Sequence, residues 1–178
     1  MFFGKIDHRK NDLVVNALRT YLTNSTKVIG NIVVLREINV PEFRFKQAAS
    51  VRTFKKDHAS HETPIHVCVC NHGVLLADRM GALSADYAHP YMSYVPMTHA
   101  INTLILMLQF MNANTKSIFF DSCWSAANAA KQHPAFVVDG CWARIPCKAS
   151  SIPIAGHVND PMDNVSLDSM IAFWGTLY

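Results

Sequence analysis

A histidine-glycine pair and a later cysteine have the types and spacing needed for a base and a thiol nucleophile. His72 and Cys123 each follow a short run of strand-forming residues, and the cysteine comes 51 residues after the histidine. A thiolate attacks a carbonyl carbon when a nearby histidine takes the thiol proton and backbone N–H groups bind the oxyanion that forms. The amides of Gly73 and Cys123 could supply those N–H groups. The pattern therefore predicts acyl transfer through a Cys-His dyad.

The two runs that precede these residues are typical of buried parallel strands. Residues 65–70 and 117–120 are short, apolar and rich in β-branched or aromatic side chains. The carboxyl ends of parallel strands meet at one edge of an open α/β sheet, where ligands bind. A helix expected over 124–132 would place Cys123 at a helix N-terminus, whose free N–H groups favour a thiolate.

The rest of the chain alternates between strand and helix patterns. Further strands are expected over 2–6, 31–38, 135–138 and 152–155, helices over 11–23, 43–57, 97–112 and 167–177, and a long loop over 74–94. The alternation predicts an α/β fold with a doubly wound, mostly parallel central sheet of about six strands. Because no linker or repeat interrupts the 178 residues, a single domain spanning 1–178 is expected.

The composition argues against several classes of function. Lys and Arg are scattered despite a net charge of +3, so nucleic-acid binding is not expected. The longest apolar run, 101–111, is too short to cross a bilayer. Five cysteines and no apolar leader indicate a reduced, cytoplasmic protein. Since the sequence has neither a C-x-x-C pair nor a glycine-rich phosphate loop, no metal and no cofactor are expected.

The two reactive segments resemble the clan of caspase-like cysteine peptidases, which includes metacaspases and the bacterial CHAT-type proteases. In that clan one hydrophobic strand ends in His-Gly, and a later strand ends in a small residue followed by the nucleophilic Cys. Metacaspases carry Asp-Ser-Cys-His-Ser-Gly where this chain has Asp-Ser-Cys-Trp-Ser-Ala over 121–126, so four of six positions match. The resemblance covers nearly the whole chain. It implies a three-layer fold, with helices on both faces of the sheet, that cleaves a protein or peptide substrate.

The same resemblance implies a pocket for the P1 residue, the substrate residue before the cleaved bond. The metacaspase Asp two residues before the nucleophile lines an acidic pocket for Arg or Lys, and Asp121 holds that position. Cys70 falls at a second pocket position, two residues before His72, and Ser122 is a third substrate-binding candidate. As an alternative, Asp121 caps the following helix. Members of this clan are commonly inactive until their loops are ordered, so an activating partner or a homodimer is also implied.

Two other functions remain open from the sequence. The chain could be a catalytically inactive caspase-like module that binds a partner, because the ring of Trp124 stands beside the nucleophile and could fill the substrate site. It could also be a thiol amidase that uses Cys123 with His157, since that histidine is followed by Asp160 in the order of other thiol hydrolases.

Overall fold

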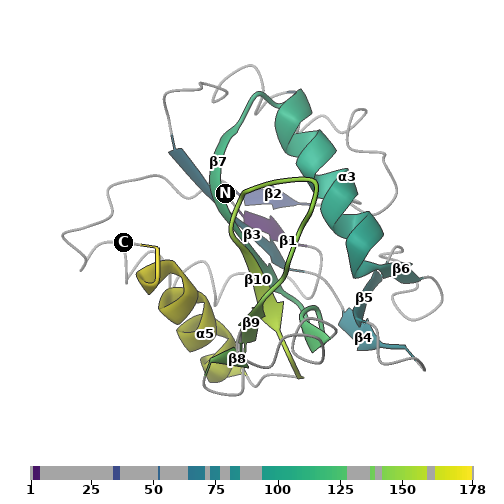
Figure 1. Ribbon diagram of the computed structural model, residues 1–178, viewed down its shortest axis with the longest axis vertical. Helices are drawn as coiled ribbons and strands as arrows, with labels where there is room; N and C mark the ends of the chain where they lie inside the picture. Colours follow the sequence, from purple (N-terminus) through teal and green to yellow (C-terminus); the bar gives the residue numbers. More distant parts are fainter. Residues whose placement is uncertain are drawn as a thin grey trace.

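The computed structural model describes residues 2–4, 34–36, 52, 64–70, 73–76, 81–84, 94–127, 137–138, 142–159 and 163–177. They form a central sheet with a helix on each side, and a small second sheet lies at one end of the longer helix (Figure 1). The expectation of a mixed α/β fold with a mostly parallel sheet is confirmed.

Seven strands form the main sheet in the described part of the chain, in the order β2-β1-β3-β7-β10-β9-β8. The strands are β1 (Phe2–Gly4), β2 (Val34–Arg36), β3 (Pro64–Cys70), β7 (Asn114–Asp121), β8 (Val137–Val138), β9 (Trp142–Arg144) and β10 (Ile154–His157). The first five in this order are parallel, whereas β9 is antiparallel to both β10 and β8. Counted along the chain, the parallel strands stand in the order 2-1-3-4-5, and in open α/β sheets of this order ligands bind at the carboxyl edge.

Separate apolar cores lie on the two faces of this sheet, because successive strand residues point to opposite faces. Helix α3 (Met97–Phe110) packs with one set of strand side chains, namely Val67, Val69, Ile118, Phe120 and Ile154. Helix α5 (Asp163–Gly175) packs with the alternate set, namely Cys68, Phe119, Trp142 and Ala155. Phe119 and Phe120 are fully buried on opposite faces, and each contributes on the order of 1.5–3 kcal/mol by its burial. The central strand β7 is thus held from both sides.

Most expected elements that fall on described residues are present. The strands expected over 2–6, 31–38, 65–70, 135–138 and 152–155 and the helices over 97–112 and 167–177 correspond to β1, β2, β3, β8, β10, α3 and α5. The strand expected over 117–120 starts earlier, at Asn114. The helix over 11–23 lies outside the described residues, as does that over 43–57 apart from Arg52, which is helical.

The prediction of a loop over 74–94 is wrong. Strands β4 (Gly73–Leu75), β5 (Gly81–Ser84) and β6 (Tyr94–Pro96) form a small antiparallel sheet. Runs of three or four residues are too short for a reliable alternating pattern, which explains why the sequence did not reveal them. Leu83 of β5 is fully buried in the α3 core. The small sheet therefore fixes the segment that begins just after His72.

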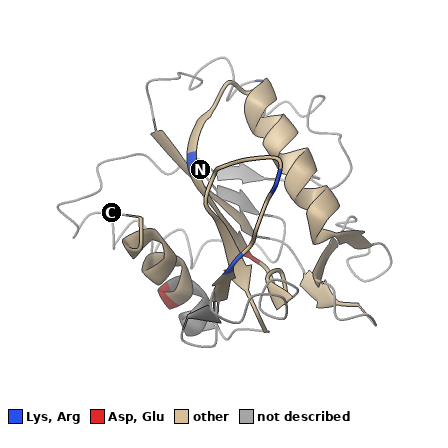
Figure 2. Ribbon diagram, viewed as in Figure 1, with Lys and Arg blue, Asp and Glu red and all other residues tan. Residues whose placement is uncertain are grey.

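Charged residues are sparse over the described ribbon, and Lys and Arg do not gather on one element there (Figure 2). Among the described residues, no helix is both long enough and apolar enough to span a membrane.

Candidate active site

The candidate residues stand at the carboxyl ends of neighbouring parallel strands. Strand β3 ends at Cys70 and β7 ends at Asp121, and these two residues are partners in the register of the sheet. On the other side of β7, Gly156 of β10 pairs with Phe120, so His157 ends its strand beside Asp121. His72, two residues beyond β3, lies outside the described residues.

Gly73 brings the chain after His72 against the candidate nucleophile. A Cβ atom placed on Gly73 would overlap the carbonyl oxygen of Cys123 and would lie 2.9 Å from its backbone nitrogen, closer than real Cβ atoms approach. Only a glycine fits this contact without a shift of the backbone. The residue that immediately follows His72 therefore touches the backbone of Cys123.

Cys123 lies in a turn rather than in the first turn of a helix, which corrects the helix expected from residue 124. The Ser125 N–H donates to the Ser122 carbonyl at 3.2 Å, and the first helical residue after Cys123 is Ala127. The reason is the backbone of Trp124, whose φ of 60° is left-handed and cannot start a right-handed helix. Cys123 itself is partly exposed.

The left-handed conformation of Trp124 is held by its neighbours. A bulky residue in this region costs about 1–2 kcal/mol and persists only where the surrounding structure imposes it. The Trp124 N–H donates to the Asn159 carbonyl at 3.0 Å, and Gly81 of β5 packs against the Trp124 carbonyl group. The turn is thus constrained both by the segment that follows β10 and by the small sheet.

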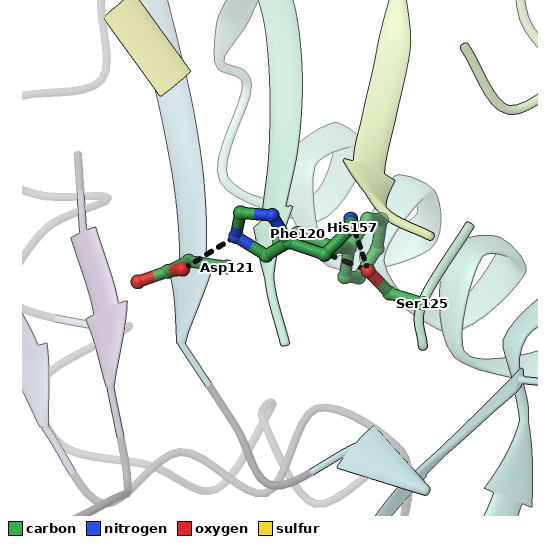
Figure 3. Close-up of polar contacts among 4 residues, drawn as sticks. All are labelled: Phe120, Asp121, Ser125 and His157. Carbon is green, nitrogen blue, oxygen red and sulfur yellow. Dashed lines mark hydrogen bonds and ion pairs between the residues drawn. The ribbon is translucent and has the colours of Figure 1, made fainter. Parts of the chain in front are cut away.

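Asp121 and His157 form a buried hydrogen-bonded pair (Figure 3). The Nε2 of His157 donates to Oδ1 of Asp121 at 2.8 Å, and the two side chains are 0% and 2% exposed. The ring of Phe119 packs edge-on against the imidazole, with 5.2 Å between ring centres. Within the described part of the chain, the Nδ1 of His157 has no hydrogen-bond partner. This arrangement gives no support to His157 as the base for Cys123.

Ser125 links the same turn to the end of β10. Its hydroxyl donates to the Phe120 carbonyl at 3.2 Å and accepts the backbone N–H of His157 at 3.1 Å (Figure 3). A Cβ on Gly156 would overlap this hydroxyl, so glycine is needed there as well. The Ala126 N–H donates to the His157 carbonyl at 2.7 Å. The roles of Ser125 and Gly156 were not predicted from the sequence, although a glycine inside a strand signals a close approach of another group.

The remaining site candidates differ in accessibility. Asp121 and Ser122 are buried, with exposed fractions of 4% and 2%, whereas Cys123 is partly exposed.

Among the described residues, no group of three or more His, Cys, Asp or Glu side chains could hold a metal ion.

No protein-family model, curated protein or solved structure matches the chain.

Proposed function

We propose that this protein is a caspase-like cysteine endopeptidase with Cys123 as nucleophile and His72 as base. The contact between Gly73 and the backbone of Cys123 carries the proposal, because it joins the residue after His72 to the nucleophile at the carboxyl edge of the sheet. The proposal includes a three-layer caspase-like fold with helices on both faces of the central sheet, which has seven strands among the described residues rather than about six.

The reaction follows from the chemistry of these groups. His72 takes the proton of the Cys123 thiol, and the thiolate attacks the carbonyl carbon of a peptide bond. The Gly73 and Cys123 amides donate hydrogen bonds to the oxyanion of the tetrahedral intermediate. As the C–N bond breaks, His72 returns the proton to the leaving amine, and a thioester remains on Cys123. Water activated by His72 then hydrolyses the thioester and releases the acid product and the free enzyme.

The proposed substrate is a protein or peptide with Arg or Lys at P1. Asp121 supports this specificity because it ends the strand that leads to the nucleophile, two residues before Cys123, and a carboxylate there attracts a cationic P1 side chain. Ser122 and Cys70 complete the proposed substrate-binding set. Activation by a partner or by a second copy of the chain belongs to the same proposal.

Active-site labelling tests the dyad directly. Acyloxymethyl ketone probes with Arg, Lys or Asp at P1 are incubated with the wild type and with Cys123→Ala, His72→Ala and Cys147→Ala, and adducts are counted by intact mass. Cys147 is a second partly exposed cysteine and provides the matched control. We expect one adduct per chain in the wild type and in Cys147→Ala, none in the other two variants, and the fastest labelling by the Arg probe.

Other results point to the alternative functions. Labelling that survives His72→Ala but is lost in His157→Ala would replace the proposal with the thiol amidase. A folded wild type that no probe labels, but that binds a reversible peptide aldehyde without cleaving peptides, would favour the inactive binding module. The position of Trp124 beside the nucleophile, with its side chain partly exposed, is the observation that keeps this module as the second candidate.

A further inference from the structure

We infer that His157 is a positioning residue that holds the Cys123 turn in its reactive geometry. The inference rests on the proposed function, since it concerns the same nucleophile. His157 takes no part in the proposed proton transfers, yet it contacts the chain on both sides of Cys123.

Three contacts of His157 define this role. Its Nε2 donates to Asp121, two residues before the nucleophile, at 2.8 Å. Its backbone N–H donates to the hydroxyl of Ser125, two residues after the nucleophile, at 3.1 Å. Its carbonyl accepts the N–H of Ala126 at 2.7 Å. One residue at the end of β10 therefore fastens both ends of the turn that carries Cys123 (Figure 3).

The burial of His157 indicates what its side chain contributes. The residue is 0% exposed and its Nδ1 has no hydrogen-bond partner in the described structure, which is an unfavourable state for a polar atom. An apolar side chain of similar size would avoid that penalty but would remove the hydrogen bond that His157 donates to the Asp121 carboxylate. The Nε2–H group is therefore the part of the imidazole that the site uses.

The strained backbone at Trp124 explains why the turn needs the stabilising contacts that His157 makes. Its φ of 60° is unfavourable for a tryptophan, so a loosened turn relaxes toward a right-handed conformation. Relaxation would rotate the adjoining Cys123 and separate its sulfur from the base. A misplacement on the order of 1 Å can lower a rate about 100-fold, since proton transfer and attack depend on close alignment. The effect is expected on kcat rather than on KM.

Two substitutions of His157 separate positioning from general stability. His157→Gln keeps an N–H donor near the place of Nε2, whereas His157→Leu removes it at similar volume. His66 provides the matched control, because it is also a strand histidine with a side-chain partner, the Ser117 hydroxyl at 2.6 Å, but lies before the carboxyl end of β3. The control variant is His66→Leu. Each protein is assayed for kcat and KM on the peptide that matches its best probe, for the rate of Cys123 alkylation by iodoacetamide, and for urea unfolding.

We expect His157→Leu to lower kcat by about 10- to 100-fold with KM within about threefold, and to slow alkylation of Cys123. His157→Gln should stay within about threefold of the wild type, and His66→Leu should lose stability but keep kcat. If His157→Leu fails to fold, Ser125→Ala removes only the hydroxyl contact and should lower kcat by about 3- to 10-fold.

The inference is overturned if His157→Leu loses no more kcat than His66→Leu at equal stability, or if a folded His157→Gln is as inactive as His157→Leu. The second result would make the imidazole itself essential. Failure of the proposed function looks different, because the wild type would then cleave no peptide. The alkylation rates of Cys123 in the Gln and Leu variants would still decide the positioning role.

Discussion

Gly73 lies directly against the backbone of Cys123, so two residues 50 positions apart in the sequence touch at the carboxyl edge of the main sheet. The contact is made by backbone rather than by side chains, which makes it sensitive to the addition of a single methyl group. It also places the start of the small sheet against the turn that carries the candidate nucleophile.

The first prediction concerns this contact. Gly73→Ala should lower the free energy of unfolding by about 1–3 kcal/mol, because the new Cβ overlaps the Cys123 carbonyl group, and should slow labelling of Cys123. Gly175→Ala is the control, since a Cβ there meets nothing within 4 Å and alanine favours helices by about 1 kcal/mol. Urea unfolding and labelling rates measure both effects. Equal behaviour of the two variants would contradict the close approach of Gly73 to Cys123.

The second prediction isolates the backbone of Trp124. Asparagine tolerates the left-handed region, whereas a β-branched valine does not. Both Trp124→Asn and Trp124→Val remove the indole ring, so their difference reports the conformation alone. We expect the valine variant to be less stable by about 1–2 kcal/mol in urea unfolding and to react more slowly with iodoacetamide. Equal stabilities would show that the φ of 60° does not constrain this position.

The third prediction separates the charge of Asp121 from its hydrogen bond. Asp121→Asn keeps an oxygen acceptor for the His157 Nε2–H but removes the negative charge. It should change stability by less than about 1 kcal/mol and lower the preference for Arg over citrulline at P1 by about tenfold or more. Asp121→Ala leaves the buried His157 nitrogen without an acceptor and should cost about 1–3 kcal/mol. An unchanged Arg preference in Asp121→Asn would remove Asp121 from the proposed pocket.

The fourth prediction concerns pH and His66. Burial lowers the pKa of His66 below its ordinary value of 6.5, with smaller effects from nearby positive charges, Lys116 among them. As the pH falls through 6.5, the His66 imidazole becomes protonated in the unfolded chain but stays neutral in the native protein, because its native pKa is lower. Stability is therefore lost on acidification, and this loss levels off below the folded pKa.

His66→Asn tests this assignment, because an amide can still hydrogen bond to Ser117 but does not titrate. Unfolding free energies are compared between about pH 7 and about pH 5, where the variant should lose less stability than the wild type. The difference should be small, since His66 is only half-buried. Identical slopes for the two proteins would assign the pH dependence to other groups.

The sequence predicted the strands that lead to the site because buried parallel strands are continuous apolar runs, as β3 and β7 are. It did not predict the pairing of Asp121 with His157, which joins residues 36 positions apart through the register of β7 and β10. The helix expected from residue 124 failed for a local reason, since a left-handed Trp124 is not visible in residue type. Long-range register and single backbone angles are properties that local patterns do not encode.

The candidate site is divided among three segments whose contacts span long stretches of chain. Gly73 meets Cys123, and Asp121 meets His157, only after β3, β7 and β10 have aligned. Contacts of such long range form late in folding, because the chain must first close large loops. A newly made or partly folded chain thus has the Cys123 thiol, but it lacks the contacts of Gly73 and His157 that build the site around it. If the proposed activity holds, the assembly order of the sheet itself delays cleavage of other proteins until synthesis has passed residue 157.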